Sequence, residues 1–224
     1  RVNQLQTTAA CFVLTEDEDQ DFIRKYFEIN GFNLTETEFI SYSGADQIDA
    51  SMVVAKYLAE KWPDSKIVIH RDRDYLADEK IAALRGKITR QGYSFYVTRG
   101  VDVEGQFVNA AHIAALYPLI PIEEAEAMIV QATAEAEEDS VSRLIDQFFK
   151  KEKPENQGYA RKIRELRQQY SDDQERYRYG KKVFGLLKSK VQRKIGTHPD
   201  ILRYSPHIVD QDLSEISLRV WPQI

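Results

Sequence analysis

Cysteine is nearly absent from this sequence, since Cys11 is the only one among 224 residues. A single cysteine excludes disulfide bonds within the chain, and this composition is typical of proteins that work in the reducing cytosol. We therefore expect a cytoplasmic protein. No run of apolar residues approaches the roughly 20 that a transmembrane helix needs, so we expect no membrane contact.

Positively charged residues are also fewer than negatively charged ones. Lysine and arginine together number 31, against 36 aspartates and glutamates, which gives a net charge of −5. Such a balance excludes a protein that binds polyanions over its whole surface. Any contact with nucleic acid must therefore be local, through a basic patch or through bridging metal ions.

The apolar residues fall into short runs that alternate with helical patterns. The runs predict strands, and apolar residues that recur every three or four positions predict helices between them. Strands separated by helices indicate βαβ units, so the fold class that we expect is α/β, with a mostly parallel sheet flanked by helices. Ligand chemistry in such sheets lies at the carboxyl ends of the strands. The predicted strands span residues 10–15, 38–44, 66–69 and 93–98, and the predicted helices lie around residues 19–28, 48–62 and 81–88.

The second half of the chain has a different character. It contains an acidic helix-forming stretch, an apolar stripe at helical spacing and two basic helical patterns, while only residues 216–220, "ISLRV", read as a strand. The sequence therefore predicts two parts. The first, residues 1–120, is the α/β domain, and the second, residues 121–224, is a helical extension.

Carboxylates gather where the predicted strands end. Asp72 and Asp74 follow the third strand, and Glu16 follows the first. Alternate residues of an extended segment project to the same side, and neighbouring first and third strands would bring Glu16 opposite both aspartates. Clustered carboxylates repel one another unless a cation neutralises them, and Mg²⁺ and Mn²⁺ prefer oxygen ligands. The sequence therefore predicts a divalent-metal site at this edge, with Glu104 after the fourth strand as a further ligand.

Simpler interpretations stay open for the same region. An Asp-x-Asp pair often lies in a solvated turn, and the acids at 16–19 could simply favour the start of a helix. Asp102 is a weaker candidate ligand. His70 could bind a metal, but a histidine beside a strand end is more often packed or hydrogen-bonded. Arg71 and Arg73 alternate with the aspartates and would point away from the metal, where they could clamp a phosphate or balance charge.

This arrangement resembles the Toprim domain of topoisomerases, bacterial primases and nucleases of the OLD (overcoming lysogenization defect) type, and it looks closest to the OLD-type nucleases. The resemblance covers residues 6–116, with a Gly-Lys pair in the helical part as a further match. The sequence departs from the family at Asp17, where a glycine is common, and at Gln20, where OLD-type nucleases often carry an acid. The matching residues are Glu16, Ser43, Gly44, Asp72, Asp74, Glu104 and Lys181.

The resemblance implies a DNA endonuclease that hydrolyses phosphodiesters with two Mg²⁺ or Mn²⁺ ions. On this hypothesis, Glu16, Asp72 and Asp74 bind the ions and act in catalysis together with Lys181. Glu104 completes the metal site. The basic tract at 176–194 is interleaved with aromatic residues and could follow the DNA backbone. The residues that we expect to contact nucleic acid are Arg71, Arg73, Lys182 and Lys188.

The resemblance also implies partners. Nucleases of this type are usually joined to an ATPase or act with a separate one, for example in phage defence or DNA processing, and we expect a homo-oligomer. No Walker motif occurs in this sequence, so an ATPase would lie upstream in the same chain or on another chain.

Three other functions stay open. The acidic pair after the first strand superficially resembles a receiver domain of signalling proteins, although the Asp-x-Asp pair and the long helical half do not follow that plan. Toprim chemistry without hydrolysis, as in a primase or topoisomerase, lacks a visible zinc motif or a nucleophilic tyrosine. The departures at Asp17 and Gln20 would suit a catalytically degenerate module that only binds a partner or nucleic acid.

Overall fold

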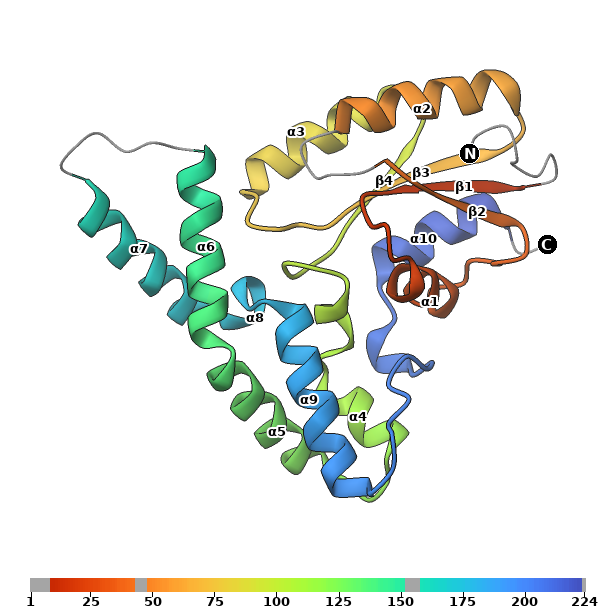
Figure 1. Ribbon diagram of the computed structural model, residues 1–224. Coiled ribbons are helices and arrows are strands. Elements are labelled where there is room, and N and C mark those ends of the chain that lie inside the picture. Colours follow the sequence, from red (N-terminus) through yellow and green to blue (C-terminus); the bar gives the residue numbers. More distant parts are fainter. Residues whose placement is uncertain (1–8, 43–47, 152–157, 223–224) are drawn as a thin grey trace. The chain divides into compact units, whose positions relative to one another are not determined.

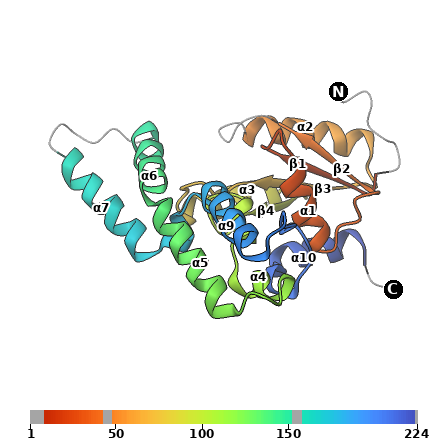
Figure 2. The same cartoon turned by 60° about the horizontal axis from the view of Figure 1, so that its bottom comes forward.

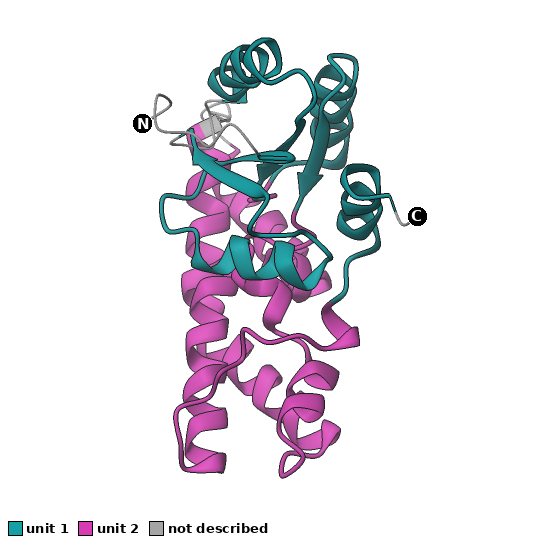
Figure 3. Ribbon diagram, turned by 90° about the vertical axis from the view of Figure 1, so that its right-hand side faces the viewer, with its two compact units in different colours: residues 1–72, 76–97, 209–224 teal, residues 73–75, 98–208 magenta. Residues whose placement is uncertain are grey.

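The computed structural model describes residues 9–42, 48–151 and 158–222, and these divide into two compact units (Figure 3). Unit 1 comprises residues up to 72, residues 76–97 and residues from 209 onward, and unit 2 comprises residues 73–75 and 98–208. The expected division at residue 120 does not coincide with these units. Residues 73–75 and 98–120 belong to unit 2, and the segment from residue 209 onward belongs to unit 1.

Unit 1 is built on a four-stranded parallel sheet in the order β2-β1-β3-β4. The strands are β1 (Cys11–Thr15), β2 (Thr37–Ser41), β3 (Lys66–Arg71) and β4 (Ser94–Val97). β1 is buried along its whole length, as expected for a continuous apolar run in a sheet covered on both faces. The α/β class and the parallel sheet are confirmed, and β1 lies directly beside β3 as the sequence predicted.

Helices cover both faces of this sheet (Figure 1). On one face, α2 (Ile48–Lys61) and α3 (Asp78–Thr89) pack on a cluster that includes Phe12, Leu14 and Ile69. On the other face lie α1 (Asp21–Ile29) and α10 (Gln211–Val220). Because side chains alternate along a strand, residues next to those of the cluster, such as His70 after Ile69, face the second pair of helices.

The predicted C-terminal strand at residues 216–220 is wrong, because these residues form the end of α10. Leu213, Ile216 and Ser217 are buried on one side of the helix, and their spacing in the sequence is helical. The carboxylate of Asp210 caps this helix by accepting the backbone N–H of Leu213 at 3.1 Å. The N–H of Asp210 in turn donates to Oδ1 of Asn30 at 2.6 Å, which fixes the start of α10 near α1.

Unit 2 is helical in its described part. Its elements are α4 (Ala110–Leu116), α5 (Ile122–Glu135), α6 (Glu137–Lys151), α7 (Tyr159–Asp172), α8 (Gln174–Tyr177) and α9 (Gly180–Ile195), with short 3₁₀ turns η3 (Glu104–Phe107) and η4 (Pro206–Ile208). Helices α5 and α9 lie side by side (Figures 1 and 2). A second cluster, formed by Val141, Leu144, Leu166 and Tyr170, joins α6 to α7.

Ser43 and Gly44, which the resemblance matches at the end of the second strand, lie outside the described residues. Among the helices that are described, none has the length and apolar character to cross a membrane.

The docking of α10 on unit 1 generates the first prediction. Leu213 is fully buried, whereas Leu218 on the same helix is 50% exposed. We expect Leu213→Ala to lower the free energy of unfolding by about 2–5 kcal/mol, because it leaves a cavity. Leu218→Ala should change it by less than about 0.5 kcal/mol. Urea denaturation measures both, and equal small effects would show that α10 does not belong to the core of unit 1.

Candidate functional site

The carboxyl ends of β1 and β3 meet because the two strands run parallel and in register, with Leu14 opposite Ile69. Glu16 follows the end of β1, and Asp72 follows the end of β3. Oε1 of Glu16 accepts the backbone N–H of Asp72 at 2.9 Å. The strand order therefore brings these two residues together, as the sequence predicted, while their roles as ligands stay a prediction.

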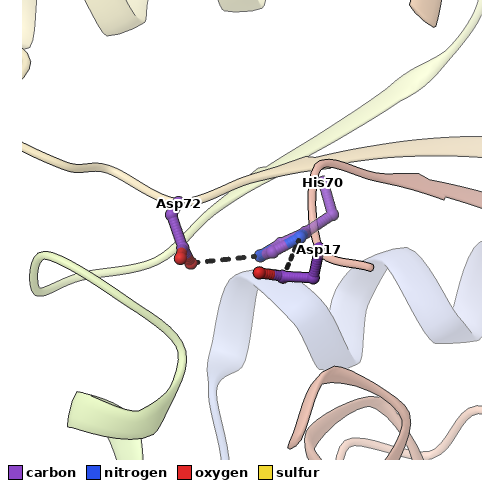
Figure 4. A group of neighbouring side chains, drawn as sticks. All are labelled: Asp17, His70 and Asp72. Atoms are coloured by element: carbon purple, nitrogen blue, oxygen red, sulfur yellow. Dashed lines mark ion pairs between the residues drawn. The ribbon is translucent and has the colours of Figure 1, made fainter. Parts of the chain in front are cut away.

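Three side chains at this edge could hold a metal ion: Asp17, His70 and Asp72 (Figure 4). One ligand atom from each lies within 4.8 Å of the ligand atoms of the other two. Nε2 of His70 is 3.7 Å from Oδ1 of Asp72, and Nδ1 of His70 is 4.0 Å from Oδ2 of Asp17. Two carboxylates and an imidazole are common metal ligands in proteins.

His70 is held rigidly at the centre of this group. Its ring has no exposed surface and stacks on Tyr96 at 5.9 Å between ring centroids, with the edge of Phe27 at 6.1 Å. Nδ1 lies 2.9 Å from the hydroxyl oxygen of Thr15, the last residue of β1. Burial lowers the pKa of His70 to about 3, so the imidazole is neutral near pH 7.

Sequence reasoning did not place Asp17 and His70 in the site. The sequence shows Asp17 as one of the acids at 16–19 and as a departure from the resembling family, and it leaves His70 open as a ligand without selecting it. A signal for His70 was available, because His70 and Asp72 stand two positions apart and alternate residues of a strand share a face. Asp17 carried no comparable signal, since it lies just beyond the end of β1.

The same edge of the sheet is rich in negative charge. Burial raises the pKa of the Tyr42 phenol, and the carboxylates of Glu16, Asp17 and Asp72 raise it further, while Arg71 opposes them. The Tyr42 hydroxyl donates to the backbone carbonyl of His70 at 3.0 Å. A cation placed among these carboxylates would be stabilised by the same potential.

The predicted phosphate clamp at Arg71 meets an obstacle, because this side chain is only 4% exposed. Its guanidinium therefore offers little surface to a polyanion, and its positive charge opposes the effect of the carboxylates on the pKa of Tyr42. Arg73 is half-buried and belongs to unit 2, where its backbone N–H donates to the hydroxyl of Thr98 at 2.8 Å.

Asp74 also belongs to unit 2 and has an uncommon backbone. Its φ of 51° is the only positive value at a non-glycine position in the described parts of the chain. Aspartate tolerates this left-handed conformation better than most residues. Strand β3 ends at Arg71, so the extended segment assumed for the Asp-x-Asp pair does not reach Asp74. The N–H of Asp74 donates to the carbonyl of Val101 at 2.8 Å instead.

In unit 2, Asp102 lies at the N-terminus of α9. Oδ2 of Asp102 accepts the backbone N–H of Lys181, and Oδ1 accepts that of Gly105, both at 3.0 Å. Burial, followed by the charge of Glu104, raises the pKa of Asp102 to about 7. The residue therefore stabilises the start of a helix that is remote in sequence, a role that sequence reasoning missed.

The same contact explains the Gly-Lys pair of the predicted lysine motif. A Cβ atom added at Gly180 would overlap Oδ1 of Asp102 and lie 2.6 Å from the nitrogen of Gly105, so only glycine fits there. The next residue, Lys181, places Nζ 3.8 Å from Oε1 of the buried Glu104. The two predicted site residues of this unit, Lys181 and Glu104, are thus neighbours.

The other predicted nucleic-acid contacts on α9 differ from Lys181. Nζ of Lys182 lies 3.1 Å from Oδ2 of Asp139 on α6, and both side chains are about half exposed. Lys188 is partly buried further along α9. Both side chains have some exposed surface, and their expected contact with DNA stays a prediction.

Searches for similar proteins give no independent guide to function. No protein-family model, no curated protein and no solved structure matched this chain.

The approach of α9 to Asp102 generates the second prediction. We expect Gly180→Ala to destabilise the protein by more than 1 kcal/mol, because the new methyl group must displace Asp102 or the backbone of Gly105. The matched control is Gly185→Ala on the same helix, where nothing lies within 4 Å of the added Cβ atom. That change should stabilise by up to about 1 kcal/mol, because alanine favours a helix. Chemical denaturation that ranks the two variants in the opposite order would contradict the close contact.

Proposed function

We propose that this protein is a divalent-metal-dependent nuclease that hydrolyses phosphodiester bonds in DNA. The observation that carries the proposal is the convergence of Asp17, His70 and Asp72 at the joined carboxyl ends of β1 and β3. Sheets of this kind commonly bind ligands at that edge. The type of reaction is proposed from the resemblance to OLD-type nucleases, in which the residues that match Glu16 and the Asp-x-Asp pair bind metal.

The donor set of unit 1 fits a cation. Asp17 and Asp72 supply carboxylate oxygens, and their mutual repulsion would be relieved by a positive ion. Glu16 takes part by accepting the backbone N–H of Asp72, which fixes the loop that carries this ligand. On the resemblance alone, Asp74 and Glu104 are proposed as further ligands and the ions as Mg²⁺ or Mn²⁺.

The chemistry needs both a nucleophile and charge stabilisation. A divalent cation supplies these by lowering the pKa of a bound water and by neutralising charge on the phosphodiester. The chain's own residues orient the reactants: Asp72 is held by its backbone bond to Glu16, and Lys181 is held next to Glu104 at the start of α9. Lys181 is proposed to stabilise the charge that develops on the phosphoryl oxygens.

The biological setting is proposed from the resemblance alone. Nucleases of the OLD type act with an ATPase, so the present chain would be the effector part of an ATPase-coupled system such as phage defence. With a net charge of −5, it must hold DNA through local contacts, for which Arg73, Lys182 and Lys188 are the proposed residues. The rival possibility, a degenerate module that binds but does not cleave, is decided by the experiment below.

Nicking of supercoiled DNA tests the proposal. We expect cleavage with Mn²⁺ or Mg²⁺ and none after chelation. Asp72→Asn should reduce the rate on the order of 100-fold or more, because removing a ligand perturbs the bound cation. The matched control is Asp212→Asn, whose side chain lies on α10 of the same unit and is 70% exposed. Full activity in Asp72→Asn would remove this residue from the site, and a folded, metal-binding wild type without activity would support the binding module.

The two adjacent lysines generate a separate prediction. Consecutive helical residues point about 100° apart, and their partners differ accordingly: Lys181 pairs with the buried Glu104 and Lys182 with the exposed Asp139. We expect Lys181→Ala to abolish most cleavage while sparing metal binding, and Lys182→Ala to have a mild effect. The rate of nicking and the Mn²⁺ affinity of both variants check this. Equal, small losses would mean that the lysine match with the nucleases is accidental.

A further inference from the structure

The hydrogen bonds around the Thr15 hydroxyl are the basis for assigning the proton on the His70 ring. Thr15 Oγ1 accepts the backbone N–H of Asp17 at 3.3 Å and donates its single proton to Oδ2 of Asp17 at 3.2 Å. The third neighbour is Nδ1 of His70 at 2.9 Å. Since the hydroxyl proton is already used, we assign a proton to Nδ1, which donates to Thr15.

With the proton on Nδ1, the neutral ring carries a lone pair on Nε2. This atom is fully buried and makes no hydrogen bond to any side chain or backbone group of the described residues. It faces Oδ1 of Asp72 at 3.7 Å, which is too long for a hydrogen bond. A lone pair that faces a carboxylate oxygen is unfavourable unless a positive charge lies between them.

The spacing suits a shared cation. Metal ions bind histidine nitrogen and carboxylate oxygen at about 2.0–2.2 Å, so two ligands of one ion lie at most about 4.4 Å apart. The separation of 3.7 Å falls within that limit. A metal-binding histidine usually donates its other ring N–H to a partner that orients the ring, and the Thr15 hydroxyl would be that partner here.

We infer that His70 binds the cation through Nε2, that Thr15 is its positioning residue, and that the site consequently prefers a first-row transition ion such as Mn²⁺, Co²⁺ or Zn²⁺ to Mg²⁺. An imidazole nitrogen is a regular ligand of Co²⁺ and Zn²⁺ and is also accepted by Mn²⁺, whereas Mg²⁺ prefers an all-oxygen site and retains its water. The inference rests on the metal site of the proposed nuclease but not on its hydrolytic step. It narrows the choice of ion that the carboxylates alone leave open.

The test uses the full chain with Mn²⁺ and no DNA. Pulsed electron paramagnetic resonance detects a ligand nitrogen through its coupling to the bound Mn²⁺. We expect coupling to one histidine nitrogen in the wild type, and its loss in His70→Gln. The chain has four histidines, so labelling histidine with ¹⁵N and replacing the exposed His198 and His207 by glutamine assigns the signal without disturbing the core.

A matched control is provided by His112 of unit 2. It is also fully buried, but both of its ring nitrogens have partners, at 2.7 Å to the Ser205 hydroxyl and 2.9 Å to the Ile201 carbonyl. His112→Gln should therefore leave the nitrogen coupling unchanged. If His70→Gln does not fold, the labelled wild type still decides the question.

The role of Thr15 is tested by a pair of variants. Thr15→Val has nearly the same shape but removes the acceptor of the Nδ1 proton, and Thr15→Ser restores it. We expect the ratio of Mg²⁺ to Mn²⁺ dissociation constants to fall about 10-fold or more in Thr15→Val and to recover in Thr15→Ser. A purely structural role for the hydroxyl would leave this ratio unchanged.

The outcomes separate this inference from the nuclease proposal. Mn²⁺ bound without nitrogen coupling, or a ratio unaffected by Thr15→Val, would overturn the inference while leaving an all-oxygen nuclease site intact. Nitrogen coupling in a protein that never nicks DNA would confirm the inference and contradict the nuclease proposal. Absence of any Mn²⁺ binding would overturn both.

Discussion

The parallel pairing of β1 with β3 is the constraint on which the rest of the site depends. It brings Thr15, Glu16 and Asp17 at the end of one strand next to His70 and Asp72 at the end of the other. Because side chains alternate in both strands, Thr15 and His70 face the same side of the sheet and meet at 2.9 Å. A shift of one residue in the register would turn His70 toward α2 and α3 and separate it from both aspartates.

The chemistry of this edge is unfavourable for stability alone. A histidine ring without exposed surface lies among aromatic rings, and the carboxylates of Asp17 and Asp72 lie within 4.0 Å of it. A buried polar nitrogen without a hydrogen bond costs about 1–3 kcal/mol, and close carboxylates repel one another. Apolar residues would fill the same volume at lower cost. A cation bound among these groups would offset both penalties at once.

The sheet and most helices could be predicted because their signals are local. Apolar runs such as residues 10–15 and the spacing of Ile81, Leu84 and Ile88 depend on neighbours in the sequence. The strand prediction at residues 216–220 fails because a short apolar run suits either a strand or a buried helix, and the cap at Asp210 selects the helix. The proximity of Glu16 and Asp72 could also be predicted from the sequence, because strand order follows from the α/β class.

The remaining features depend on contacts between residues far apart in the sequence. Nothing near Asp102 indicates that it caps a helix 79 positions later, or that Gly180 must be glycine because that carboxylate lies against it. The same holds for Thr15 and His70, 55 positions apart, whose side chains meet at 2.9 Å. Such roles follow from packing and proton positions, which a pattern of residue types does not encode.

Crystals soaked in Mn²⁺ and measured at a wavelength where manganese scatters anomalously would test the central claim most directly. We expect an anomalous peak at the carboxyl ends of β1 and β3, within about 2.3 Å of Nε2 of His70 and of a carboxylate oxygen of Asp72. A peak bound by carboxylates alone would contradict the part assigned to His70. A fully occupied manganese site elsewhere, with this edge of the sheet empty, would contradict the account as a whole.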